Sequence, residues 1–119
     1  MFDFERLDIY KVLRDLNHMV FTLLGKDLVI DPMIKEQWKK ASLNAVLNLV
    51  EGTGRIVNTE KQVYLTTSRG NIFESVAILQ QVFDLGWITS DQYRELNEKY
   101  EQASKMLLGM YRSYNPATT

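Results

Sequence analysis

Apolar residues recur at intervals of three and four along four long stretches of this 119-residue chain. Because an α-helix has about 3.6 residues per turn, this spacing puts the apolar side chains on one face of a helix. The chain lacks the two-residue alternation of strands and carries no hairpin signal. The sequence therefore predicts an all-α fold, in which residues 1–119 form a single domain with an up-down-up-down antiparallel four-helix bundle.

Start and stop signals divide the chain into helices at about residues 8–24, 32–52, 60–85 and 90–114. Asp31 is a suitable N-cap, and the proline that follows it suits the first helical position. Thr59 and Thr89 each precede a glutamine by three residues, which is the spacing of a capping box. These signals predict short connections between the four helices.

The second helix carries apolar residues on two sides. One stripe consists of Ile34, Trp38, Ala41 and Ala45, and the other of Leu43, Val46, Leu47 and Val50. A helix of this kind must touch two sets of neighbours, because a surface helix usually buries a single stripe. It is therefore either a central helix or a contact between subunits. Residues 93–114 of the last helix form a heptad seam, which predicts packing within the bundle or between subunits.

The composition indicates a cytoplasmic protein. The chain has no cysteine, which excludes disulfides and zinc-thiolate sites, and no apolar run reaches the roughly 18 to 20 residues of a membrane span. The first residues lack the basic and apolar segments of a signal peptide. We therefore expect no membrane association.

The charge is unevenly distributed although the net charge is −1. Residues 32–70 hold three acidic and six basic residues, a net of +3, whereas the flanking segments are each −2. This middle segment is the one best suited to face a polyanion, although the same lysines would also serve as an ordinary solvated helix surface. The predicted nucleic-acid-binding residues are Lys35, Lys39, Lys40 and Arg55. Trp38 and Trp87 would stack on bases or, more commonly at helical spacing, pack in the core.

Two polar motifs interrupt the apolar helices, at residues 51–55 and 69–74. Their charged and glycine positions are Glu51, Gly52, Gly54, Arg55, Arg69, Gly70 and Glu74. The first motif is either a backbone pocket that binds phosphate through Arg55, or a structural helix end in which its glycines allow left-handed backbone and close chain approach. In the second, Gly70 suggests that another backbone packs closely. We expect the charges to pair across helices, as Glu51 with Arg69 or Arg55 with Glu74.

Catalytic and metal-binding patterns are lacking. Glu51 and Glu74 resemble the paired carboxylates of di-iron bundles, but those proteins use Glu-x-x-His, and the single histidine, His18, has no glutamate at that spacing. The serines occur in no nucleophile motif. The sequence predicts a protein that is not an enzyme and that binds no metal or cofactor.

The two motifs and their order resemble the four-helix-bundle family of 23S ribosomal RNA intervening-sequence proteins. The matching pieces, which span nearly the whole chain, are residues 4–10, 48–55, 64–65, 68–74 and 84–88. The chain departs from the family at Asn71, where serine is more usual, and at residues 46–48, where many members have a proline-bearing turn.

The resemblance implies a bacterial cytoplasmic protein, often encoded within an insertion in the large ribosomal RNA gene, for whose family no biochemical activity is established. Members are similar to the accessory variability protein of diversity-generating retroelements, a barrel-like homopentamer that contacts nucleic acid and a reverse transcriptase. Our first hypothesis is a non-enzymatic homo-oligomer, a pentamer by resemblance, that binds RNA weakly. The alternative is a scaffold that binds a partner protein such as a polymerase.

Overall fold

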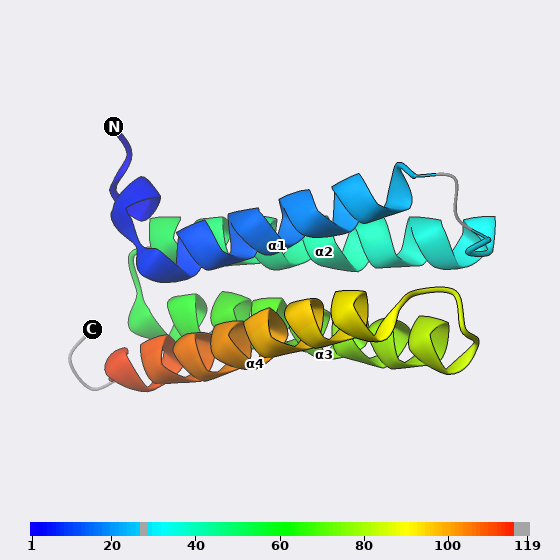
Figure 1. Cartoon of the computed structure of the whole chain (residues 1–119). Coiled ribbons are helices and arrows are strands. Elements are labelled where there is room, and N and C mark those ends of the chain that lie inside the picture. The colour runs from blue at the N-terminus through cyan, green and yellow to red at the C-terminus, as the bar shows by residue number, and fades with distance from the viewer. Residues whose placement is uncertain (27–28, 116–119) are drawn as a thin grey trace.

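The computed structural model describes residues 1–26 and 29–115, which form four long helices packed side by side (Figure 1). A short 3-10 helix, η1 (Asp3–Arg6), precedes α1 (Asp8–Leu24), α2 (Pro32–Gly54), α3 (Asn58–Asp84) and α4 (Ser90–Ser113). Each helix runs antiparallel to the one before it, and α1 packs against α4 to close the bundle. The predicted all-α four-helix bundle is confirmed.

Two of the predicted helix starts have the expected capping bonds. Asp31 Oδ1 accepts a hydrogen bond from the backbone N–H of Met33 at 2.8 Å. Thr89 and Gln92 form a reciprocal capping box, in which each side chain accepts from the other residue's backbone N–H. These side chains satisfy amides that would otherwise lack an intrahelical partner.

The predicted cap at Thr59 is wrong. Helix α3 already begins at Asn58, and the carbonyl of Val57 accepts the first hydrogen bonds. The glutamine expected to complete that capping box, Gln62, instead donates to the carbonyls of Tyr111 and Tyr114 at 3.1 and 2.7 Å. It therefore binds carbonyls at the end of α4, of which that of Tyr111 also accepts the capping bond from the Tyr114 backbone N–H.

The centre of the core is a hydrogen bond between two aromatic side chains. Trp38 on α2 and Tyr100 on α4 are the largest fully buried side chains, and Trp38 Nε1 donates to Tyr100 Oη at 3.0 Å. Burial raises the pKa of Tyr100 to about 12. Because Trp38 is fully buried, its alternative role in stacking on bases is wrong.

Small residues bring α2 and α3 close together. Ala41, Ser42 and Ala45 are buried on α2. The hydroxyl of Ser68 on α3 donates a hydrogen bond to the Ala45 carbonyl at 2.7 Å. The contact between these two helices is the most extensive in the bundle. Short side chains at the interface permit this close approach without leaving a buried hydroxyl unpaired.

The two apolar stripes of α2 have different environments. Trp38, Ala41 and Ala45 of the first stripe are buried in the core, whereas Leu43 and Leu47 of the second are 41% and 53% exposed. Helix α2 is therefore not surrounded by its own chain, and the prediction of a central helix is wrong. In the second stripe, Val46 packs against the core and Val50 is half-buried, whereas Leu43 and Leu47 are open to solvent in a single chain. We call Leu43 and Leu47 the leucine stripe.

The described residues form an elongated body of 49 × 26 × 23 Å. Within them, no helix combines the length and the apolar character that crossing a membrane requires.

Replacing Tyr100 by Phe should lower the free energy of unfolding by about 1 to 3 kcal/mol, because Trp38 Nε1 would remain buried without an acceptor. Urea denaturation at pH 7 measures the change. Tyr93→Phe is the matched control, since this half-buried ring stacks on Phe83 and makes no comparable hydrogen bond in the described structure. A Tyr100→Phe loss no larger than that of the control would contradict a stabilising role for the bond.

The unfolding free energies of the wild type and Tyr100→Phe should become more similar in alkaline solution. The pKa of Tyr100 is raised from 10.0 to about 12 on folding, so its protonated form contributes stability that is fully present below pH 10. As the pH rises from 10 toward 12, the wild type should lose this contribution, whereas Tyr100→Phe has no phenol to ionise. The difference in unfolding free energy between the two chains should therefore shrink.

Candidate functional site

The first polar motif lies at the end of the bundle where α2 connects to α3. Arg55 follows the last residue of α2, and its Nη2 donates to Glu51 Oε1 at 2.5 Å and to Tyr64 Oη at 2.7 Å. The guanidinium also lies 4.8 Å from the centre of the Tyr64 ring. The bond to Glu51 raises the pKa of Arg55. Arg55 thus joins the end of α2 to the first turns of α3.

Gly52 is the point of closest approach between these helices. A Cβ atom on Gly52 would lie 2.9 Å from Cβ of Tyr64, closer than such atoms approach in proteins. By contrast, a Cβ on Gly54 would meet nothing within 4 Å. The prediction of close chain approach therefore holds at Gly52 and fails, within this chain, at Gly54 and Gly70.

The phosphate-pocket interpretation of this motif is not supported by its backbone. Both glycines belong to α2, and among the described residues Gly86 alone has a positive φ, of 74°, so the predicted left-handed backbone is wrong. The motif is also the C-terminal end of a helix, where the helix dipole repels anions. Lys61 Nζ donates to the exposed end of this helix, at the Thr53 carbonyl, at 3.0 Å. The geometry is that of a structural helix end.

The second polar motif faces α4. Arg69 is half-buried, its Nε donates to the Ser104 carbonyl at 3.2 Å, and its guanidinium lies 4.7 Å from the centre of the Phe73 ring. Asn71 points the other way and accepts a hydrogen bond from Asn48 on α2 at 3.0 Å. The motif therefore connects α3 to both of its neighbours.

The predicted pairs of Glu51 with Arg69 and of Arg55 with Glu74 are wrong. Because α2 and α3 run antiparallel from a short connection, residues at equal distances from that connection face each other, as the Ser68 bond to Ala45 shows. Arg55 and Glu74 lie at different heights in this register. Glu51 and Arg69 also lie at different heights, Arg69 is turned toward α4, and Glu51 pairs within its own helix instead.

The same register separates the two carboxylates considered for metal binding. Glu51 is near the end of α2 and Glu74 is in the middle of α3, which places them roughly 20 Å apart along the bundle. Across the described residues, no group of three or more His, Cys, Asp or Glu side chains is arranged to hold a metal ion.

The four predicted nucleic-acid-binding residues are divided between the two ends of α2. Lys35, Lys39 and Lys40 lie in its first turns, and Arg55 follows its last residue, about 22 Å from Lys40 along the helix. Lys39 is 3.8 Å from Glu36 in an ion pair, and its Nζ is 5.9 Å from the ring centre of Phe21 on α1. The lysines thus form one cluster, and Arg55 is not part of it.

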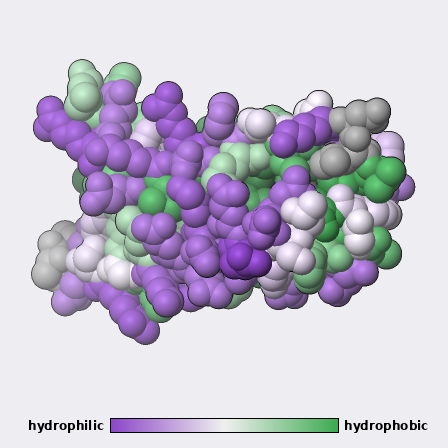
Figure 2. Space-filling model, in the orientation of Figure 1, coloured by the Kyte–Doolittle hydropathy of each residue, from purple (hydrophilic) through white to green (hydrophobic). Residues whose placement is uncertain are grey.

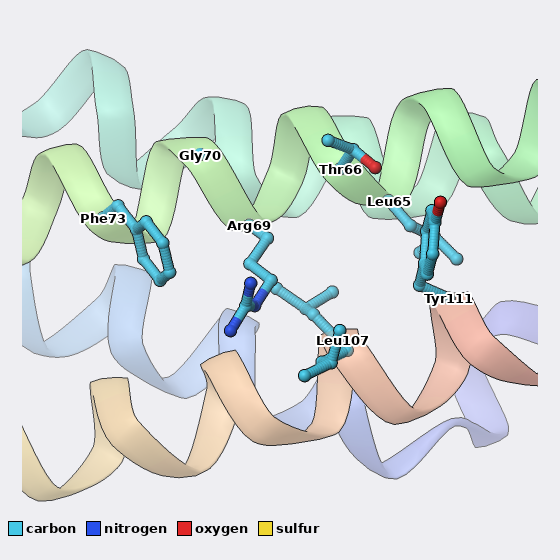
Figure 3. Close-up of a pocket in the computed structure, with 8 residues that line it drawn as sticks. Leu65, Thr66, Arg69, Gly70, Phe73, Leu107 and Tyr111 are labelled. Carbon is cyan, nitrogen blue, oxygen red and sulfur yellow. The ribbon is translucent and has the colours of Figure 1, made fainter.

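Sequence reasoning missed a groove between α3 and α4. We call it the α3–α4 groove. Its central pocket has a volume of about 380 Å³ and includes Thr66, Arg69, Gly70, Phe73, Leu108 and Tyr111 in its lining (Figure 3). Pockets that share Arg69 and Phe73 on one side, and Thr66 and Tyr111 on the other, continue it along the helices. The sequence contains one signal for this groove: Arg69, which is in its lining, is the single charged residue between Lys61 and Glu74.

Replacing Gly52 by Ala should destabilise the fold by about 1 to 3 kcal/mol, because the added methyl group forces α2 and α3 apart. Gly109→Ala on α4 is the control: its Cβ meets nothing within 4 Å, so higher helix propensity should stabilise the chain by up to about 1 kcal/mol. Thermal unfolding of both variants measures the effect. Equal responses would show that the close approach at Gly52 is unimportant.

Comparison with solved structures shows the same fold in a distant relative. A crystal structure of a protein of unknown function from the S23 ribosomal protein family of Bacteroides thetaiotaomicron superposes with a TM-score of 0.78 at 15% sequence identity. The alignment covers 87% of this chain and 97% of that one. No curated protein matches the chain.

The sequence profile of the 23S rRNA-intervening sequence proteins matches residues 5–109, which includes both polar motifs and all four helices except the last residues of α4. The chain therefore belongs to the 23S rRNA-intervening sequence protein family.

Proposed function

We propose that this protein is a non-enzymatic, self-assembling module, a homo-oligomer whose subunits meet through surfaces that include exposed apolar residues of α2 and α3. The observation that carries the proposal is the exposure of the leucine stripe on α2. Large apolar side chains that are exposed together on one surface commonly mark a protein–protein contact. Of the two roles that the sequence pattern left open for the second stripe, this exposure supports a contact between subunits.

Exposed apolar side chains are concentrated on two of the four helices. Among the large apolar residues, α4 exposes none and α1 exposes Phe21, whereas α2 and α3 expose Met33, Leu43, Leu47, Val63 and Phe73. Figure 2 shows the face formed by α1 and α4, where hydrophilic side chains cover most of the surface and apolar ones gather toward one end. This asymmetry supports one set of solvated helices and one set that meets other subunits.

The positions of the polar side chains support a non-enzymatic role. Arg55, Lys61 and Arg69 each donate to a backbone or side-chain oxygen that ties one helix to another or closes a helix end. The charges of the two motifs are thereby used to hold the bundle together.

Replacing Leu43 and Leu47 together by Ser should weaken self-association at least tenfold. The two leucines are exposed in the single chain, so their apolar surface would be removed from water only when subunits associate. Light scattering after size-exclusion chromatography gives the mass at several concentrations. Leu85→Ser is the matched control, since Leu85 is similarly exposed (57%) but lies in the connection after α3. A wild-type chain that stays monomeric at tens of micromolar would contradict the proposal.

The lysine cluster supports a second candidate function, weak binding of RNA. Lys35 and Lys39 lie one turn apart on the same side of α2, and Lys40 is exposed beside them. Glu36 is the one carboxylate in this stretch of α2, so the cluster keeps an excess of positive charge. Repeating it around an oligomer would multiply the number of phosphate contacts.

Reversing the charge of Lys35 and Lys39 to Glu should raise the Kd for a structured RNA at least tenfold, equally for different sequences, and flatten the salt dependence. Fluorescence anisotropy at low and physiological salt measures both quantities. Lys11→Glu with Arg14→Glu, on the exposed face of α1, is the control with the same change of charge. Light scattering must show that the assembly is intact. Unchanged affinity would leave the partner-protein alternative, which a nuclease-resistant pull-down tests.

A further inference from the structure

The α3–α4 groove has an unusual floor and rim. Leu65 and Leu107 are buried beneath it, Phe73 is 54% exposed at its edge, and Gly70 opens directly into it (Figure 3). A Cβ on Gly70 would meet nothing within 4 Å in the same chain. A glycine in the middle of a long helix weakens that helix, and here no contact within the subunit compensates for it.

The leucine stripe lies on the opposite side of the bundle. Leu43 shares a surface depression with Phe21 of α1, and Lys39, one turn before it, also contacts Phe21. The stripe therefore belongs to the side formed by α1 and α2. Since the helices pack in the order α1, α2, α3, α4 around the bundle, the side formed by α3 and α4 faces the other way.

The two surfaces lie at the same height along the bundle. Leu43 is 11 residues before the end of α2, and Gly70 is 12 residues after the start of α3. Both are therefore about 17 Å from the connection between these helices. By the same comparison Leu47 is level with Thr66. Two subunits placed side by side with parallel axes would bring the leucines opposite the small residues of the groove.

The charges beside these surfaces are complementary. Lys40 and Glu74 are exposed, and neither forms an ion pair with another described residue. They lie about 21 and 24 Å from the connection between α2 and α3, so parallel subunits would bring them close together.

We infer that the α3–α4 groove is the receptor for the leucine stripe of a second copy, which inserts Leu43 and Leu47 against Gly70 and Thr66 and pairs Lys40 with Glu74. The contact is head-to-tail, because it joins two different surfaces of the same subunit, and it forms a closed ring where the rotation between subunits closes. The absence of a side chain at Gly70 gives the leucine room to approach the α3 backbone. This inference rests on the proposed self-assembly and specifies its geometry.

Mixing two assembly-defective chains tests it. A stripe variant, Leu43→Glu with Leu47→Glu, loses the inserted surface, and a groove variant, Gly70→Glu with Phe73→Ser, loses the receptor. Each alone should be monomeric. The mixture should form a 1:1 dimer that grows no further, since one intact stripe meets one intact groove. Circular dichroism melting confirms that both chains fold, and all changes are at exposed positions.

The outcomes separate this inference from the proposed function. A groove variant that assembles like the wild type, while the stripe variant does not, would overturn the groove assignment and leave self-assembly standing. Two monomeric variants that do not combine would also overturn it, since they would indicate a contact between like surfaces. A monomeric wild type would refute self-assembly itself. As a further check, Lys40→Glu should weaken association at least tenfold, and adding Glu74→Lys should restore it.

Discussion

The bundle depends on the buried hydrogen bond between Trp38 and Tyr100. These are its two largest fully buried side chains, and they lie on diagonally opposed helices that otherwise make little contact. A purely apolar core tolerates sliding of one helix past another, whereas a directional bond between two ring systems does not. The bond thereby sets the register of α2 against α4, and the two short connections transmit that register to α3.

With this register in place, the polar motifs serve the fold. Gly52 lets α3 approach α2, Arg55 binds Tyr64 on the next helix, and Arg69 reaches the backbone of α4. Of the residues proposed from the sequence to bind nucleic acid, Arg55 holds the end of α2. The surfaces left for function are an exposed leucine stripe on one side of the bundle and an apolar groove on the other. Both are suited to binding another helical surface.

Two of the three helix starts predicted from local signals are confirmed. The caps at Asp31 and Thr89 depend on neighbouring backbone amides, so the sequence alone predicts them. The cap at Thr59 failed because the glutamine it required bonds to carbonyls of α4, which lie far away in the sequence. The predicted ion pairs between helices are wrong for a related reason, because helical spacing does not specify which helix a charged side chain faces. The groove was missed because its lining comes from two helices.

The sequence by itself determined the number of helices, their approximate limits and the presence of two apolar stripes on α2, because these follow from periodicity and local hydrogen bonding. The tertiary structure decided which stripe is buried, where each arginine bonds and which glycine is needed for close packing. Periodicity specifies the angle between two faces of a helix but not which face meets a neighbour. That choice is made by the packing of all four helices around Trp38 and Tyr100, and it leaves Leu43 and Leu47 exposed.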